Sequence, residues 1–287
     1  MAGVPLTASA RRWVLTWPLW PQALLFAAFF VAPVAVIALA SLHANSGAWT
    51  VANYTAFAVD PYNRTVIIRT LVIGIATTAI TLVLGYPLAR AIARGRPAVR
   101  WLLSGLVFFP LLTSSVIRSF GWLVLLADNG IFNNALTFIG LPRTHLIFNA
   151  YGVTIALAQV LLPFMVLSLV SAMANIDVSI EEAASTLGSP PVRRFFRVTL
   201  PMLVPGILAG SLLVFAIAIS AFVTPALMGG PRAEVMATLI YTNATQVGNI
   251  GLASAASLIL LGLTLAIVTL YYRVVLSTNY VAAGQAS

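Results

Sequence analysis

One polar stretch interrupts the apolar runs of this chain, and it reads Asp177-Val-Ser-Ile-Glu-Glu-Ala-Ala-Ser-Thr-Leu-Gly188, then Ser-Pro-Pro191-Val-Arg-Arg-Phe-Phe-Arg-Val-Thr-Leu-Pro201. Ser179 is followed three residues later by Glu182, which is the pattern of a capping box at the start of a helix. Gly188 can take the left-handed conformation that ends a helix. The stretch therefore predicts a short helix that begins near Ser179 and closes at Gly188.

A second short helix is predicted directly after the first. Pro190 and Pro191 prevent the first helix from resuming at once, and Pro191 suits a first helical turn, where its missing N–H needs no partner. This second segment combines arginines with aromatic residues, namely Arg193, Arg194, Phe195, Phe196 and Arg197. That combination is typical of a membrane–water interface. We expect a bent pair of helices at residues 177–201.

Helices this short are marginal in water unless something else holds them. Ala183 and Ala184 stand side by side in the first helix, and such small residues let another surface approach closely. The pair therefore predicts a knob on the cytoplasmic face that contacts a partner protein. The alternative interpretation is an ordinary loop between two spans that happens to be capped.

The composition is that of a membrane protein. Hydrophobic residues make up 61% of the 287 residues and charged residues 7%, whereas a soluble domain has about 25% charged residues. The net charge of +9 comes entirely from arginine, because the sequence has no lysine. These arginines lie between apolar runs, which indicates membrane topology rather than nucleic-acid binding.

Several kinds of chemistry are excluded by the residues that are missing. A P-loop needs its lysine to reach the phosphates, so this chain cannot carry a standard one. There is no cysteine, and His43 and His145 lie in separate loops, so no metal site, cofactor site or nucleophile–base pair is expected. We predict a polypeptide without catalytic residues of its own.

Six apolar runs are long enough to cross a bilayer core of about 30 Å. They lie near residues 20–42, 66–90, 101–127, 149–173, 203–227 and 250–274. The prediction is an all-α membrane protein with six transmembrane helices in residues 20–274. Residues 1–19 form a cytoplasmic N-terminal segment, and residues 275–287 form a C-terminal tail that is unstructured from Ala282.

The distribution of arginine predicts the orientation. With the N-terminus inside, three arginines fall in outer loops: Arg64, Arg143 and Arg232. Ten fall on the cytoplasmic side: Arg11, Arg12, Arg90, Arg94, Arg96, Arg100, Arg193, Arg194, Arg197 and Arg273. Since cytoplasmic loops are enriched in arginine, residues 177–201 are expected inside the cell.

Polar residues within the spans are candidates for a translocation pathway. Arg118 follows Thr113 and Ser114 in the third run, about 25 Å from Trp101 at ~1.5 Å per residue. A charge at that depth is costly, so it marks either an outer pore mouth or a snorkelling structural arginine. Gln159 is a further candidate because its amide cannot be satisfied by its own backbone. The remaining candidates are Ser220, Phe222 and Thr224.

The polar stretch resembles the "EAA loop" of permease subunits of ABC importers. The likeness rests on Glu182-Ala183-Ala184, three further residues, Gly188, nine more residues, and then Val198-Thr199-Leu200-Pro201. The family consensus has isoleucine where this chain has Val198. In that family the loop is a coupling helix that docks on the ATPase subunit. The resemblance thus implies coupling roles for Glu181, Glu182, Ala183, Ala184, Leu187, Gly188 and Pro201.

Two further stretches resemble the first permease subunit of spermidine/putrescine-type importers. They are residues 110–134, which include Arg118 and Trp122, and residues 222–231, which begin at Phe222. Relatives often carry a carboxylate just before the position of Phe222, where this chain has Ser220 and Ala221. The resemblance implies a polyamine as the solute, although an acid at that position would favour a cation in transit and this chain lacks it. Ferric iron, phosphonate, thiamine and opine are the alternatives.

The resemblance implies an assembly in the bacterial inner membrane. It comprises two ATPase subunits, a second and different permease subunit, and an extracytoplasmic solute-binding protein. A rival hypothesis is a secondary transporter without an ATPase, which typically carries acids inside the membrane. All six acids of this chain lie outside the six apolar runs, which disfavours the rival. A membrane enzyme is disfavoured by the missing catalytic groups.

Overall fold

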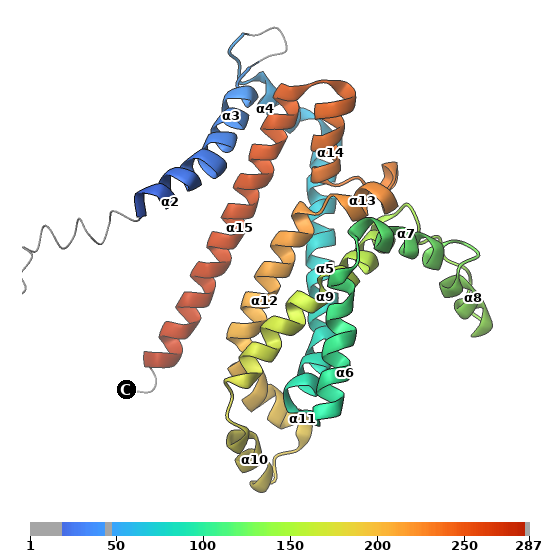
Figure 1. Ribbon diagram of the computed structural model, residues 1–287, viewed down its shortest axis with the longest axis vertical. Helices are drawn as coiled ribbons and strands as arrows, with labels where there is room; N and C mark the ends of the chain where they lie inside the picture. Colours follow the sequence, from blue (N-terminus) through green and yellow to red (C-terminus); the bar gives the residue numbers. More distant parts are fainter. Residues whose placement is uncertain (1–18, 44–47, 285–287) are drawn as a thin grey trace, which may run out of the picture.

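The computed structural model describes residues 19–43 and 48–284, and this part of the chain is almost entirely helical (Figure 1). The first half contains α2 (Leu19–Phe26), η1 (Ala27–Val31), α3 (Ala32–Ser41), α4 (Ala52–Val59), α5 (Pro61–Arg94), α6 (Pro97–Phe108), η2 (Phe109–Leu112), α7 (Ser115–Leu126) and α8 (Ile131–Phe138). The second half contains α9 (Ala150–Ala174), α10 (Val178–Thr186), α11 (Pro191–Arg194), η3 (Phe195–Thr199), α12 (Leu200–Ser220), α13 (Val223–Met228), η4 (Pro231–Ala233), α14 (Met236–Thr242), η5 (Asn243–Val247) and α15 (Ile250–Gly284).

The predicted all-α fold with six spans is confirmed. Five helical segments are long and apolar enough to cross a membrane, namely Trp20–Ser41, Pro61–Arg94, Ala150–Ala174, Pro191–Ser220 and Ile250–Arg273. A sixth span is obtained when the bent pair Pro97–Leu112 and Ser115–Phe138 counts as one.

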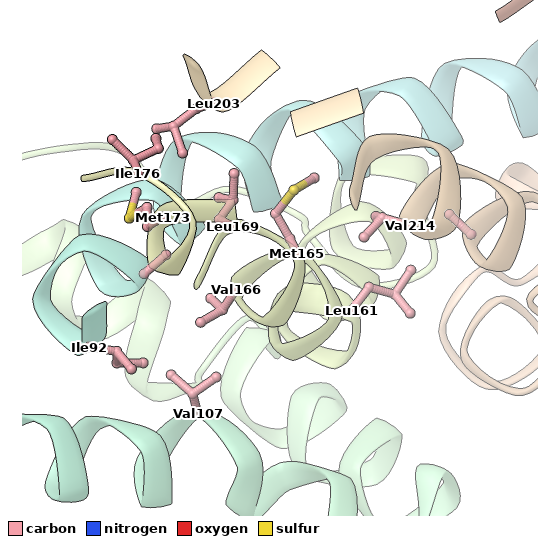
Figure 2. Packing of buried hydrophobic residues seen from close by; sticks show 12 residues of the cluster. Ile92, Val107, Leu161, Met165, Val166, Leu169, Met173, Ile176, Leu203 and Val214 are labelled. Carbon is pink, nitrogen blue, oxygen red and sulfur yellow. The ribbon is translucent and has the colours of Figure 1, made fainter. Parts of the chain in front are cut away.

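Helix α9 forms the centre of the bundle and packs against α5 and α12. Its sequence is apolar on all sides, as expected for a helix surrounded by other helices. Figure 2 shows Met165, Val166 and Leu169 of this helix within the largest cluster of buried side chains, and all three are fully buried. Residues from α5, α6 and α12 complete the cluster.

Close approach between α9 and α12 depends on Gly206. A Cβ atom added at this position would lie 2.2 Å from the Cβ of Ala172. Beside it, the hydroxyl of Ser168 donates a hydrogen bond of 2.9 Å to the Gly206 carbonyl. Because Gly206 has no side chain, the backbone of α12 comes close enough to α9 for the Ser168 hydroxyl to bond to it.

The first span lies at the edge of the bundle. Helices α2 and α3 lean away from the centre in Figure 1, and α3 packs against α15. No residue in the most apolar stretch of this span is buried. The span therefore presents its side chains to lipid or to another subunit. Arg11 and Arg12, the expected inner anchors of this span, lie outside the described residues.

The third apolar run, near residues 101–127, does not form the straight helix on which the expected 25 Å between Trp101 and Arg118 is based. Helix α6 ends at Phe108, a 3₁₀ turn follows, and the next segment is bent by 105°. Pro110 lies within this turn, lacks an N–H, and sterically opposes a regular helix. Thr113 then adopts an extended conformation at φ −95° and ψ 144°.

The bounds of two other predicted elements also change. The fifth span, expected at 203–227, ends at Ser220, because Ala221 is extended at ψ 131° and α13 starts separately. The last helix continues to Gly284, so residues 275–284 extend it by several turns, in contrast to the unstructured tail expected from Ala282. Residues 275–284 contain no proline that would interrupt the helix.

Candidate functional site

The loop between α9 and α12 lies at one end of the bundle, at the lower edge of Figure 1. Its helix α10 begins at Val178, and Asp177 is the N-cap, with its carboxylate accepting a 2.9 Å hydrogen bond from the N–H of Ser179. The predicted capping box of Ser179 and Glu182 is therefore wrong. An aspartate two residues earlier already provides the oxygen that the first free N–H groups need. The pKa of the Asp177 carboxyl is lowered from its usual value by hydrogen bonds from Ser179, mainly the one from the backbone N–H.

The C-terminal end of α10 is closed as predicted. Gly188 has φ +73°, in the left-handed region. Its N–H bonds to the carbonyl of Ser185 at 3.0 Å, and the N–H of Ser189 bonds to that of Ala184 at 3.2 Å. This is the Schellman arrangement, which satisfies carbonyls that a helix end otherwise leaves free.

The predicted second short helix is instead the first part of a long one. Helix α11, the π-helical segment η3 and α12 form one continuous helix over Pro191–Ser220. Pro201 lies in the interior of this helix, two residues after η3 ends at Thr199. The wider π-turn thus precedes the position where the proline has no N–H to donate. The sequence gives no signal for this continuity, because Pro191 and Pro201 both favour helix starts.

Three polar contacts fix the loop to the ends of the long helices. The carboxylate of Glu181 forms an ion pair with the guanidinium of Arg90 on α5, at 3.5 Å. It also accepts a hydrogen bond of 3.3 Å from the hydroxyl of Thr199, the last residue of η3. Arg94 donates a 2.7 Å hydrogen bond to the carbonyl of Ile176, just before α10. The side chain of Glu181 is only 15% exposed, so it faces the bundle.

The other side of α10 is exposed. Glu182 and Ala183 are exposed, Ala184 is half-buried, and the side chain of Leu187 is 87% exposed. The structure thus separates the predicted coupling residues into two groups. Glu181 is bonded to its own bundle, whereas Glu182, Ala183, Leu187 and Gly188 are available to another protein.

Three of the predicted pathway residues, Gln159, Thr224 and Phe222, lie at two places in the bundle. In the first, α7 meets α9 and α13. The indole N–H of Trp122 donates to Oε1 of Gln159 at 3.3 Å, and the hydroxyl of Ser119 lies 3.4 Å from that of Thr224. Gln159 and Thr224 are therefore brought close to the bent third span, while Ser220 is exposed and bonds to Ala216 of its own helix.

Arg118 does not lie on a straight helix 25 Å from Trp101, because of the bend at Pro110. Its guanidinium donates to the carbonyl of Pro110, which also accepts a 3.0 Å hydrogen bond from the Thr113 hydroxyl. Arg118 therefore stabilises the break in the third span. Ser114 forms the N-cap residue of α7 without a side-chain cap.

The second place is a pocket of about 400 Å³ near the end of the bundle opposite α10. Phe222 lies in its wall, where its ring centroid is 4.9 Å from that of Tyr241. Glu234 also lines the pocket and accepts a hydrogen bond from the hydroxyl of Tyr62. Sequence reasoning missed Glu234 and Tyr241. The available signal was that Glu234 is the only acid between the fifth and sixth spans.

Within residues 19–43 and 48–284, no group of three or more histidine, cysteine or acidic side chains is placed to hold a metal ion. The described geometry provides a short helix, α10, with one exposed face at one end, and small polar sites along the bundle.

Comparisons with known proteins point to membrane transport. A family described as "Binding-protein-dependent transport system inner membrane component" matches residues 81–279. The spermidine/putrescine transport system permease protein PotB of Haemophilus influenzae is 36% identical over 226 residues, covering 78% of this chain and 79% of that protein. PotB of Escherichia coli is 36% identical over 194 residues, covering 67% of this chain and 70% of that protein.

The fold has a counterpart among solved structures. A chain of a bacterial ABC transporter involved in the import of the acidic polysaccharide alginate superposes with a TM-score of 0.75. The superposition covers 92% of this chain and 95% of that chain, at 22% sequence identity. At this identity the likeness concerns the fold alone.

Proposed function

The chain belongs to the family of binding-protein-dependent transport system inner membrane components, and on this premise we propose that it is the permease subunit of an ATP-driven importer of spermidine or putrescine. The substrate is inferred from the relatives named as spermidine/putrescine permeases. The observation that carries the mechanism is the helix α10, which is exposed on one side and bonded to α5 and α12 on the other.

The proposed assembly has the parts that such a subunit needs. Two ATPase subunits bind on the cytoplasmic side, a second and different permease completes the membrane pathway, and a solute-binding protein delivers the polyamine outside. The chain itself is not catalytic and binds no nucleic acid. The excess of arginine near α10 supports a cytoplasmic position for this loop and for the N-terminus.

We propose that α10 passes the closing motion of the ATPases to the bundle. Glu182, Ala183, Ala184, Leu187 and Gly188 form the surface that docks on the ATPase. Glu181 connects that surface to Arg90 of α5, and its contact with Thr199 connects it to the long helix that contains Pro201. A force on α10 therefore reaches two transmembrane helices directly, so that packed bodies can rock about a central path.

The predicted pathway residues have two kinds of role in this proposal. Gln159 and Thr224 lie beside the bent third span, where a rearrangement of α7 would expose them to a solute. Arg118 and Thr113 maintain the bend through the carbonyl of Pro110, and Ser114 is the N-cap residue of α7. Ser220 and Phe222 lie where α12 ends.

Reconstitution of the complex tests this function. The permease pair and ATPase are placed in proteoliposomes with the binding protein and ATP, and uptake of radiolabelled spermidine and putrescine is measured. We expect ATP-dependent accumulation of at least one of them. Uptake that needs no ATPase and follows an ion gradient would support the rival secondary transporter, and accumulation of neither polyamine would contradict the proposed substrate.

A further inference from the structure

The pocket near the outer end of the bundle has the composition of a site for an organic cation. It is built from α13, α14 and the start of α5, at the end of the molecule opposite α10 (Figure 1). At about 400 Å³ it falls in the size range of small-molecule sites. Its charged lining residue is Glu234, and its aromatic lining residues are Tyr62, Phe222 and Tyr241.

The carboxylate of Glu234 is held in place by a hydrogen bond and forms no ion pair with the described residues. Its Oε2 accepts the hydrogen bond from Tyr62, which leaves Oε1 for a ligand. Arg69 is the neighbouring cation, but its guanidinium donates to the backbone carbonyl of Glu234 at 3.1 Å, not to the carboxylate. The ion pairs found among the described residues are Arg90–Glu181 and His145–Asp128, so Glu234 takes part in none of them.

Two aromatic rings stand beside this charge. Phe222 and Tyr241 contact each other with an angle of 50° between their planes, and both line the same pocket as Glu234. An ammonium group is attracted to the face of an aromatic ring, and more strongly where water is partly excluded. The hydroxyls of Thr238 and Thr242 and the amide of Gln246 add hydrogen-bonding groups to the lining.

The geometry points to a binding site in this pocket for an ammonium group of the transported solute, with Glu234 as the counter-charge and the Phe222–Tyr241 pair as the aromatic wall. This inference rests on the proposed function, and it assigns the first contact of the solute with this subunit. A carboxylate and aromatic rings favour a primary ammonium and disfavour an anion of the same size. The polar lining leaves the rest of a flexible amine chain partly hydrated.

The test measures binding without the solute-binding protein, because that protein otherwise determines the apparent affinity. The purified complex of both permeases and the ATPase, in nanodiscs, is titrated with radiolabelled spermidine. The variants are Glu234→Gln, which keeps the shape and the bond from Tyr62, and Glu234→Asp, which keeps the charge. Asp128→Asn is the matched control, since it removes a carboxylate that does not line the pocket.

We expect Glu234→Gln to weaken spermidine binding at least tenfold, Glu234→Asp to retain part of it, and Asp128→Asn to leave it unchanged. Neutral 1,4-butanediol should not compete. Basal ATP hydrolysis by every variant shows that the complex is assembled. If the wild-type complex imports spermidine and Glu234→Gln binds and imports it equally well, the site is refuted while the proposed function stands. If the wild-type complex neither binds nor imports spermidine, the proposed function itself fails.

Discussion

Glu181 on helix α10 and Arg90 near the end of α5 lie 3.5 Å apart, and they form the ion pair that joins the loop containing α10 to the bundle. They are 91 residues apart in the sequence. The carboxylate is largely buried and the guanidinium is 41% exposed, so the pair contributes little to global stability, about 1 kcal/mol or less. Its proposed role is to transmit motion between α10 and α5.

Replacement of Glu181 by glutamine should uncouple ATP hydrolysis from transport. We expect the number of solute molecules imported per ATP to fall several-fold, with the melting temperature nearly unchanged, because the change removes one long ion pair to an arginine that is 41% exposed. Arg90→Gln should have the same effect, and the double variant should be no worse than either single one. Arg273→Gln removes an exposed arginine from the last helix and serves as control; additive losses in the double variant would contradict a shared role.

Gly188→Ala should destabilise the end of α10 by about 1–2 kcal/mol, because φ is +73° and an L side chain is strained in that region. There is open space around the position, with no atom within 4 Å of an added Cβ, so the effect isolates backbone strain. Asparagine tolerates this conformation better, and Gly188→Asn should be milder. Hydrogen exchange of the α10 amides measures the difference, and equal protection in Gly188→Ala and wild type would exclude the strain.

Two glycine-to-alanine changes in long helices should act in opposite directions. Gly206→Ala places a methyl group against Ala172 and should destabilise the bundle by about 1–3 kcal/mol. Gly262→Ala meets no atom within 4 Å, so it should be neutral or stabilising by up to about 1 kcal/mol. Thermal unfolding in one detergent compares them, and an equal melting temperature for both variants would argue against close contact of α9 and α12.

The N-cap at Asp177 should make α10 sensitive to acid. Its pKa is lowered in the folded state by the hydrogen bonds from Ser179, so its stabilising effect is present above the usual carboxyl pKa and is lost as the pH falls through the lowered value. We expect the α10 amides to exchange faster in Asp177→Ala than in wild type at neutral pH, and the two to converge in acid. Ser179→Ala keeps the backbone N–H donor and loses only the smaller contribution of the hydroxyl, so it should lie closer to wild type than Asp177→Ala does. A constant difference between Asp177→Ala and wild type down to acid pH would disprove the assignment.

Local features of the chain were accessible from its sequence. The spans follow from uninterrupted apolar runs, since a bilayer core requires about 20 such residues per helix. The end of α10 follows from Gly188, because few other residues adopt the left-handed conformation. The likeness of residues 182–201 to a known coupling loop depended on side chains spaced within a single segment.

The tertiary structure decided the relationships between distant segments. Glu181 is part of the predicted docking stretch, yet its carboxylate turns inward because Arg90 and Thr199 meet it there. The 105° bend at Pro110 depends on how α7 packs against α9 and α13, and a proline alone does not set that angle. Glu234, Tyr62 and Phe222 converge because three helix ends meet at one pocket. Apolar periodicity and chain-local capping are encoded residue by residue, whereas these contacts arise from packing, which places residues far apart in the sequence side by side.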